Sequence, residues 1–261
     1  MRKMLLGTAA VVVLAMPALG ADLRMAPVPV FKAPASLDYF QGFYVGLNAG
    51  FGWGSDSIGI SGADPGSQRV LGFASSVGVP LGFNTNPSGF IGGGQAGYNF
   101  TYQRFVVGVE TDIDWSDIKG SAEWDNLGHK IRGLPSASSI NINDRLEWLG
   151  TTRLRGGFEL TPQWLIYATG GLAYGGVNTD VSFRFPPLAG GRSNSSTEIG
   201  WSAGAGTEYA LSQSWLIRAE WLHYDLGAAS FNLPVQATNF TAAVGTHEKG
   251  DLVRGGISYR F

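Results

Sequence analysis

Cysteine is absent from the 261-residue chain, and its absence excludes several kinds of site at once. Without a thiol the protein can form no disulfide bond, no thiolate-ligated metal centre and no cysteine nucleophile. An excess of one charge is missing too, because 18 Lys and Arg residues stand against 20 Asp and Glu residues. A nucleic-acid-binding protein needs a strongly basic surface, so we expect no nucleic-acid partner.

Long apolar runs are scarce as well, and the one near the N-terminus, Met4–Ala15, is short. Arg2 and Lys3 precede this run, and small residues follow it at Ala18 and Gly20. The pattern predicts a secretory signal peptide over residues 1–20, cut after Gly20 or Ala21. A membrane anchor is the alternative, but a spanning helix needs roughly 20 apolar residues and the run falls short of that.

What the chain has in quantity is glycine, with 39 residues, and aromatic side chains, at 12% of the sequence. The glycines follow no strict period, which excludes collagen. A Pro- and Ala-rich periplasmic linker is expected over residues 21–41, followed by one folded domain over residues 42–261.

Within this domain, apolar side chains recur at every second position, which is the period of a β-strand with one apolar face. Eight segments show the pattern and are expected to be strands: Gly42–Gly54, Gly89–Phe100, Phe105–Trp115, Trp148–Phe158, Trp164–Tyr174, Trp201–Leu211, Trp215–Leu226 and Gly250–Phe261.

The links between the expected strands alternate between short and long. Three links are tight turns, and four are long: Ser55–Ser88, Asp117–Asp144, Thr179–Ser196 and Gly227–Lys249. Short turns at one end and long loops at the other are typical of an outer-membrane barrel. The sequence therefore predicts an all-β fold, an eight-stranded antiparallel transmembrane up-and-down barrel with four long, exposed extracellular loops and short periplasmic turns.

Aromatic residues at the ends of the expected strands support a membrane location. Phe43 and Trp53 are ten positions apart, and the same spacing recurs in three further strands. Ten residues of a strand tilted by about 45° span roughly 23 Å, close to the thickness of an outer-membrane apolar band. A soluble sandwich is the alternative, but it would bury its apolar face. The aromatics expected at the membrane interfaces are Phe43, Trp53, Phe105, Trp115, Trp148, Phe158, Trp164, Tyr174, Trp201, Tyr209, Trp215, Tyr259 and Phe261.

The face opposite the apolar one carries charge and is expected to line the lumen. Its members are Glu110, Asp112, Asp114, Glu208 and Glu220, with Arg153, Arg155, Arg218, Arg254 and Arg260. About eight strands leave an interior just wide enough for side chains to fill, so we expect these charges to pair as a structural polar core. A selectivity lining around an open bore is the alternative.

Several stretches are familiar in sequence: "FYVGLNAGFGWG", "FIGGGQAGYNF", "WLGTTRLRGGF", "YATGGLAYGG", "EWLHYDLG" and the ending "GISYRF". They resemble the small outer-membrane β-barrel surface proteins of alphaproteobacteria, a porin family related to the OmpA transmembrane domain. The resemblance implies a role in envelope integrity and surface interactions. It also implies insertion by the barrel-assembly machinery, which reads a terminal aromatic strand ending in a residue such as Phe261. Outer-membrane lipid and lipopolysaccharide are the other expected partners, and the oligomeric state stays open.

Signals of catalysis are weak. Some eight-stranded barrels modify lipid with a Ser/His/acid arrangement, and His223, Asp225 and Ser230 are conceivable members of one. No spacing favours this trio, so no catalytic, cofactor or metal residues are expected. A structural surface barrel is therefore the leading interpretation. A narrow diffusion channel is the alternative, and a lipid-modifying enzyme is a minor one.

Overall fold

The computed structural model describes residues 38–261, except residues 126, 128–134, 187 and 235–239. The predicted signal peptide and most of the predicted linker lie outside the described residues. The described chain forms ten strands and one helix: β1 (Gly42–Gly54), β2 (Asp56–Gly62), α1 (Pro65–Ser76), β3 (Gly82–Thr85), β4 (Ser88–Tyr102), β5 (Phe105–Trp124), β6 (Ser139–Thr161), β7 (Trp164–Phe185), β8 (Leu188–Ala210), β9 (Trp215–Pro234) and β10 (Thr241–Arg260). Among these residues no helix has the length and apolar character needed to cross a membrane.

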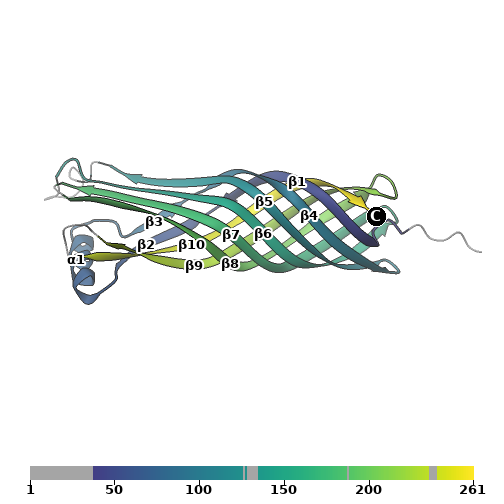
Figure 1. Cartoon of the computed structure of the whole chain (residues 1–261), viewed down its shortest axis with the longest axis horizontal. Coiled ribbons are helices and arrows are strands. Elements are labelled where there is room, and N and C mark those ends of the chain that lie inside the picture. Colours follow the sequence, from purple (N-terminus) through teal and green to yellow (C-terminus); the bar gives the residue numbers. More distant parts are fainter. Residues whose placement is uncertain (1–37, 126, 128–134, 187, 235–239) are drawn as a thin grey trace, which may run out of the picture. The chain divides into compact units, whose positions relative to one another are not determined.

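The strands form a closed antiparallel barrel. Neighbours follow the order β1, β4, β5, β6, β7, β8, β9, β10, and β10 pairs back onto β1 (Figure 1). The last strand therefore pairs on both sides, with Val253 opposite Phe51 of β1 and Trp221 of β9. Closure pairs each of these eight strands on both sides, which a strand that crosses lipid requires.

Two strands were missed by the sequence analysis, which predicted eight. β2 pairs with Ala242–His247 at the start of β10, and β3 pairs with β2. The helix α1 connects β2 to β3, and Asp64 caps its N-terminus by accepting hydrogen bonds from the N–H groups of Gly66 and Ser67. In Figure 1, α1 lies at the end of the barrel opposite the C-terminus.

The four long links are not confirmed as loops, because strand pairing that the sequence analysis did not predict extends into each of them. The segment Thr179–Ser196 is a β-hairpin in which β7 and β8 stay paired as far as Phe185 and Leu188. The pairing of β5 with β6 likewise continues to Trp124 and Ile140, and β9 stays paired with β10 as far as Pro234. The segment Ser55–Ser88 contains β2, α1 and β3.

The reason for these errors is that the polarity of the strand faces inverts along the barrel. In the second half of β6, Arg153 and Arg155 point inward and are buried, whereas Leu154 points outward and is 70% exposed. In the first half, Ile140 and Ile142 are the buried inward residues. Hence the strands have a lipid-type pattern near the C-terminal end of the barrel and a water-soluble pattern beyond it.

Inward side chains fill the barrel in three apolar layers. The distal layer, at the end that carries α1, consists of Ile58, Val79, Phe83, Leu127, Ile140, Ile142, Val181, Leu233, Ala242 and Val244. The central layer consists of Ile91, Ile118, Leu146, Leu149, Ala173, Val177, Leu222, Tyr224, Leu226 and Leu252. The proximal layer, at the C-terminal end, consists of Phe40, Val106, Leu165, Tyr167, Ala210 and Leu216.

Outward aromatic side chains gather in two belts. The proximal belt consists of Phe43, Phe105, Phe158, Trp164, Tyr209, Trp215, Tyr259 and Phe261, and the distal belt of Trp53, Trp115, Trp148, Tyr174 and Trp201. Neighbouring rings touch within the belts, as for Phe105 and Phe158, whose centroids are 5.3 Å apart. Apolar residues such as Leu47, which is 68% exposed, cover the wall between the belts. This apolar wall is the surface that a bilayer would cover, so we take the segments between the belts as the membrane-spanning ones.

The contacts of the last residue generate a prediction. The N–H of Phe261 donates to the carbonyl of Phe43 at 3.0 Å, and its ring lies 5.7 Å from that of Phe43. The resemblance implies that the barrel-assembly machinery reads this residue, so deleting Phe261 should reduce the amount of the protein in the outer membrane of cells. The contacts of Phe261 are a small part of the barrel, so the truncated protein should still refold in detergent micelles. Quantitative blotting of membrane fractions and gel mobility of the refolded protein measure the two effects.

Phe261→Tyr is the matched control, because it keeps an interfacial ring. It should reach near-normal levels in the membrane. Normal levels of the truncated protein in cells would show that the C-terminal residue plays no part in insertion.

Candidate functional site

Nine charged side chains meet inside the membrane-spanning part of the barrel, between the central and proximal layers. They are Glu110, Asp112 and Asp114 on β5, Arg153 and Arg155 on β6, Glu208 on β8, Arg218 and Glu220 on β9, and Arg254 on β10. None is more than 6% exposed. We call this set the lumen network.

Arg153 and Arg254 form one half of the network. Arg153 donates to Glu110 at 2.8 Å, to Asp112 at 2.7 Å and to Glu220 at 2.6 Å. Arg254 donates to Asp112 at 2.8 Å and to Glu220 at 2.9 Å, and its second terminal nitrogen reaches Asp114 at 2.7 Å. The two arginines therefore share two carboxylates, which ties β5, β6, β9 and β10 together across the lumen.

Arg218 and Arg155 form the other half. Arg218 donates to Glu110 at 2.6 Å, and its other terminal nitrogen lies 2.7 Å from Glu208. Arg155 lies 3.1 Å from the same oxygen of Glu208. The planar guanidinium group suits this task, because its several donors can serve more than one carboxylate at once.

Two tyrosines complete the network, and the sequence analysis did not include them in it. Tyr44 donates to Glu110 at 2.5 Å and accepts from Arg155 at 2.9 Å. Tyr167 donates to Glu220 at 2.7 Å, and its ring lies 4.1 Å from the guanidinium carbon of Arg155. The signal was present in the sequence, because Tyr44 alternates with outward-facing Phe43 on the first strand.

Two glycines make room for these tyrosine hydroxyls. A Cβ atom at Gly97 would overlap the hydroxyl of Tyr44, and one at Gly206 would overlap that of Tyr167. Both glycines lie on neighbouring strands at positions where a larger residue would displace a ring that bonds a buried carboxylate. These inward-facing glycines thus allow a tyrosine ring to lie directly against the backbone of the neighbouring strand.

Arg260 is a correction to the predicted set of charges. It does not join the lumen network; it donates to the carbonyls of Gln213 and Gln41 at the exposed turn end of the barrel. The physical reason is that Arg260 is the last residue of β10 and therefore lies beyond the end of the filled lumen. The network therefore has five acids and four arginines.

The three residues considered for catalysis are not brought together. His223 pairs with Asp251 at 3.1 Å, whereas Asp225 pairs with His247 at 2.9 Å. Ser230 lies opposite Gly245 in β9, beyond the distal belt. We call the strand segments beyond that belt, together with β2, β3 and α1, the distal extension.

Three other carboxylates could hold a metal ion, and the sequence analysis missed them. Asp56, Asp144 and Glu248 offer oxygens that lie within 4.8 Å of one another. Each falls in, or at the edge of, a segment that was predicted to be a loop. Recognising them would have required the strand pairing of the distal extension.

A cavity of about 440 Å³ opens at the distal end of the barrel. Val70, Leu71 and Ala74 of α1 form one side of it, and Phe183 and Leu233 lie on the other. The lining is almost wholly apolar, so the cavity suits an apolar group better than a charged one.

Known proteins are similar to the chain along most of its length. It matches the family described as outer membrane protein beta-barrel domain over residues 23–247. It is 32% identical to the 31 kDa outer-membrane immunogenic protein of Brucella melitensis, over 94% of this chain and 93% of that one. It is 26% identical to the 25 kDa outer-membrane immunogenic protein of Brucella abortus, over 90% of this chain and 84% of that one.

A solved structure is also similar. The outer membrane protein OprG from Pseudomonas aeruginosa aligns with 86% of this chain and 98% of its own, with a TM-score of 0.48 and 13% identity. No functional conclusion follows from a likeness at this level.

The lumen network predicts the effect of removing one cation. Arg153→Leu leaves three buried carboxylates without one of their donors and should lower the free energy of unfolding by about 3–5 kcal/mol. Loss of the compact form on gels after stepwise heating in detergent measures the change. Arg153→Lys should be intermediate, because it keeps the charge but loses the fork of donors.

Ile166→Val is the matched control on the outward face of β7. Ile166 is 43% exposed on the apolar wall, so this change should have little effect on heat resistance. Equal losses for Arg153→Leu and Ile166→Val would mean that inward charge pairing does not stabilise the barrel.

Proposed function

The chain belongs to the family of outer-membrane β-barrel proteins, and from this premise we propose that it acts as a structural surface barrel with a closed lumen. In this role it would contribute to envelope integrity and to contacts at the cell surface. The observation that carries the proposal is the filling of the lumen by nine buried charges.

A filled lumen argues for structure over transport. The charges of the network are committed to one another at 2.6–3.1 Å, with two tyrosines bonded to the same groups. Apolar layers lie on both sides of the network, and the side chain of Phe40 is fully buried in the proximal one. A solute would have to break several buried ion pairs and displace packed apolar side chains to pass.

The distal extension supports a role in surface contacts. β7 continues from Tyr174 in the distal belt to Phe185, which at about 3.3 Å per residue and about 45° tilt places its end roughly 25 Å beyond the membrane. The Brucella relatives are named as immunogenic outer-membrane proteins, which is consistent with exposure of their surfaces. We propose that the extension, with its apolar cavity beneath α1, is the part of this chain that meets other molecules.

Lipopolysaccharide is the partner that we propose at the distal belt. Lys119 and Arg145 lie opposite each other just beyond Trp115 and Trp148, and both are exposed. Exposed cations next to an aromatic belt suit the phosphate groups of a lipid headgroup layer. At the other end, we propose that the barrel-assembly machinery reads the strand that ends in Phe261.

A non-enzymatic role is part of the proposal. The family description and the names of the relatives refer to outer-membrane proteins and to no reaction. In the described part of the chain, the histidines His223 and His247 each pair with an aspartate, and Ser230 is not paired with either.

A strain that lacks the gene tests the proposed role. Deletion should increase sensitivity to detergent, leave the uptake of small hydrophilic solutes unchanged and leave the mass of lipid A unchanged. The wild-type gene supplied in trans should restore tolerance. Slower solute uptake with normal detergent tolerance would favour a diffusion channel, and an altered lipid A mass would favour an enzyme.

A further inference from the structure

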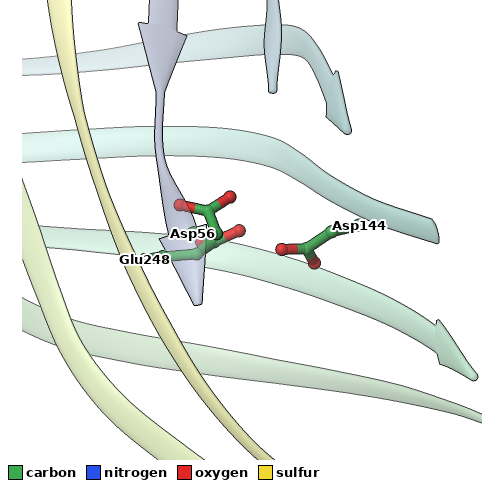
Figure 2. A group of neighbouring side chains, drawn as sticks. All are labelled: Asp56, Asp144 and Glu248. Atoms are coloured by element: carbon green, nitrogen blue, oxygen red, sulfur yellow. The ribbon is translucent and has the colours of Figure 1, made fainter. Parts of the chain in front are cut away.

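Three carboxylates from three different strands meet inside the distal extension (Figure 2). Asp56 comes from β2, Asp144 from β6 and Glu248 from β10, and one oxygen from each lies within 4.8 Å of the others. All three residues are buried, at 2%, 2% and 4% exposure. We call this set the acidic cluster.

The acidic cluster differs from the lumen network in having no cation beside it. Among the described residues, no Lys or Arg forms an ion pair with any of the three, whereas every acid of the network lies against an arginine. The hydroxyl of Thr179 donates to Asp144 at 2.9 Å, and the N–H of Lys249 donates to Asp56 at 3.3 Å. One oxygen of each carboxylate has no donor at all.

Thr85 is an independent sign that a ligand belongs here. Its side chain is 1% exposed, and its hydroxyl has no hydrogen-bond partner. Thr85 lies directly opposite Asp56 in the β2–β3 pair, so the two side chains share a face. On its other side it packs against Gly120, the cross-strand neighbour of Asp144. A buried hydroxyl normally finds a partner, and this one belongs to a residue on the same face as Asp56 and next to the strand neighbour of Asp144.

The set of donors suits a calcium ion. Calcium binds carboxylate and neutral oxygens at about 2.3–2.6 Å in a flexible arrangement, so oxygens that lie within 4.8 Å of one another can share one ion. Magnesium demands a near-ideal octahedron and usually keeps several waters, which a buried set of protein oxygens from separate strands suits less well. We propose that Asp56, Asp144 and Glu248, with the hydroxyl of Thr85, form a calcium site that fixes β2 and β3 to the barrel wall.

Without a cation the carboxyl groups would have to hold protons. The cluster lies beyond the distal belt, outside the membrane-spanning segments. Burial, reinforced by the neighbouring Asp144, raises the pKa of Asp56 to about 8 and that of Glu248 to about 10. Glu198, which is also buried and has an oxygen with no donor, adds to the negative charge acting on Asp56 and Glu248. Neutral carboxyls are thus the rival state that an experiment must separate from a bound ion.

Calcium binding is measured on the full-length protein in detergent after treatment with a chelator. Titration with CaCl₂ should show one ion per chain and a rise in the heat resistance of the barrel, with an affinity on the order of 10⁻⁴–10⁻³ M, as in other extracellular calcium modules. MgCl₂ at the same concentrations should give a smaller rise.

Asp144→Asn tests the assignment of the ligand. It should weaken calcium binding by at least ~10-fold. It should also leave the chelated protein at least as stable as the wild type, because a neutral amide needs neither a cation nor a proton at this buried position. Asp180→Asn is the matched control, since Asp180 is the exposed neighbour of Thr179 on the same hairpin. It should bind calcium like the wild type.

Two results would overturn the site. One is a wild-type protein that binds no calcium at millimolar concentrations, with an infrared band of protonated carboxyl groups that Asp144→Asn reduces. The other is calcium binding that Asp144→Asn leaves unchanged, which would place the ion elsewhere.

Discussion

The hydrocarbon of a bilayer offers a protein backbone no hydrogen bonds, and the architecture of this barrel depends on that constraint. Strands can cross only if every edge is paired, so β10 must close onto β1 as well as onto β9. Closure in turn sends every second residue into an interior that eight ring strands leave just wide enough to fill. The filling of the lumen is therefore a consequence of how the chain meets lipid.

The filling changes character along the axis because the surroundings of the wall change. Between the belts the outward face must be apolar, and the chain places its charges inward, where four arginines and five acids neutralise most of one another. Beyond the distal belt the outward face meets water, and apolar residues such as Ile142 and Val244 take the inward positions instead. The acidic cluster lies in this second region, near the point where the inward face passes from one kind of filling to the other.

The membrane-spanning half could be predicted from the sequence because period two, aromatic spacing and inward charge all point to the same arrangement there. Thus Arg153 and Leu154 lie on the faces that alternation assigns them. The distal half could not be predicted, because its turn-rich stretches suggested loops and its inverted alternation was taken as the end of each strand. The assignment of Arg260 to the lumen was wrong for a different reason: alternation gives the direction of a side chain but not the point at which the lumen ends. The acidic cluster depends on pairings between residues almost 200 positions apart, such as β2 with β10, which no local pattern reveals.

The central claim is that the charges of the lumen pair with one another, fill the barrel and leave no path for ions. Conductance of the purified wild-type protein in planar bilayers tests it most directly, with insertion verified by the heat-dependent gel mobility of the protein recovered from the membrane. The account predicts no steady conductance steps above the background of the bilayer across a range of voltages and salt concentrations. Steady, ion-sized steps that scale with the amount of inserted protein would contradict it.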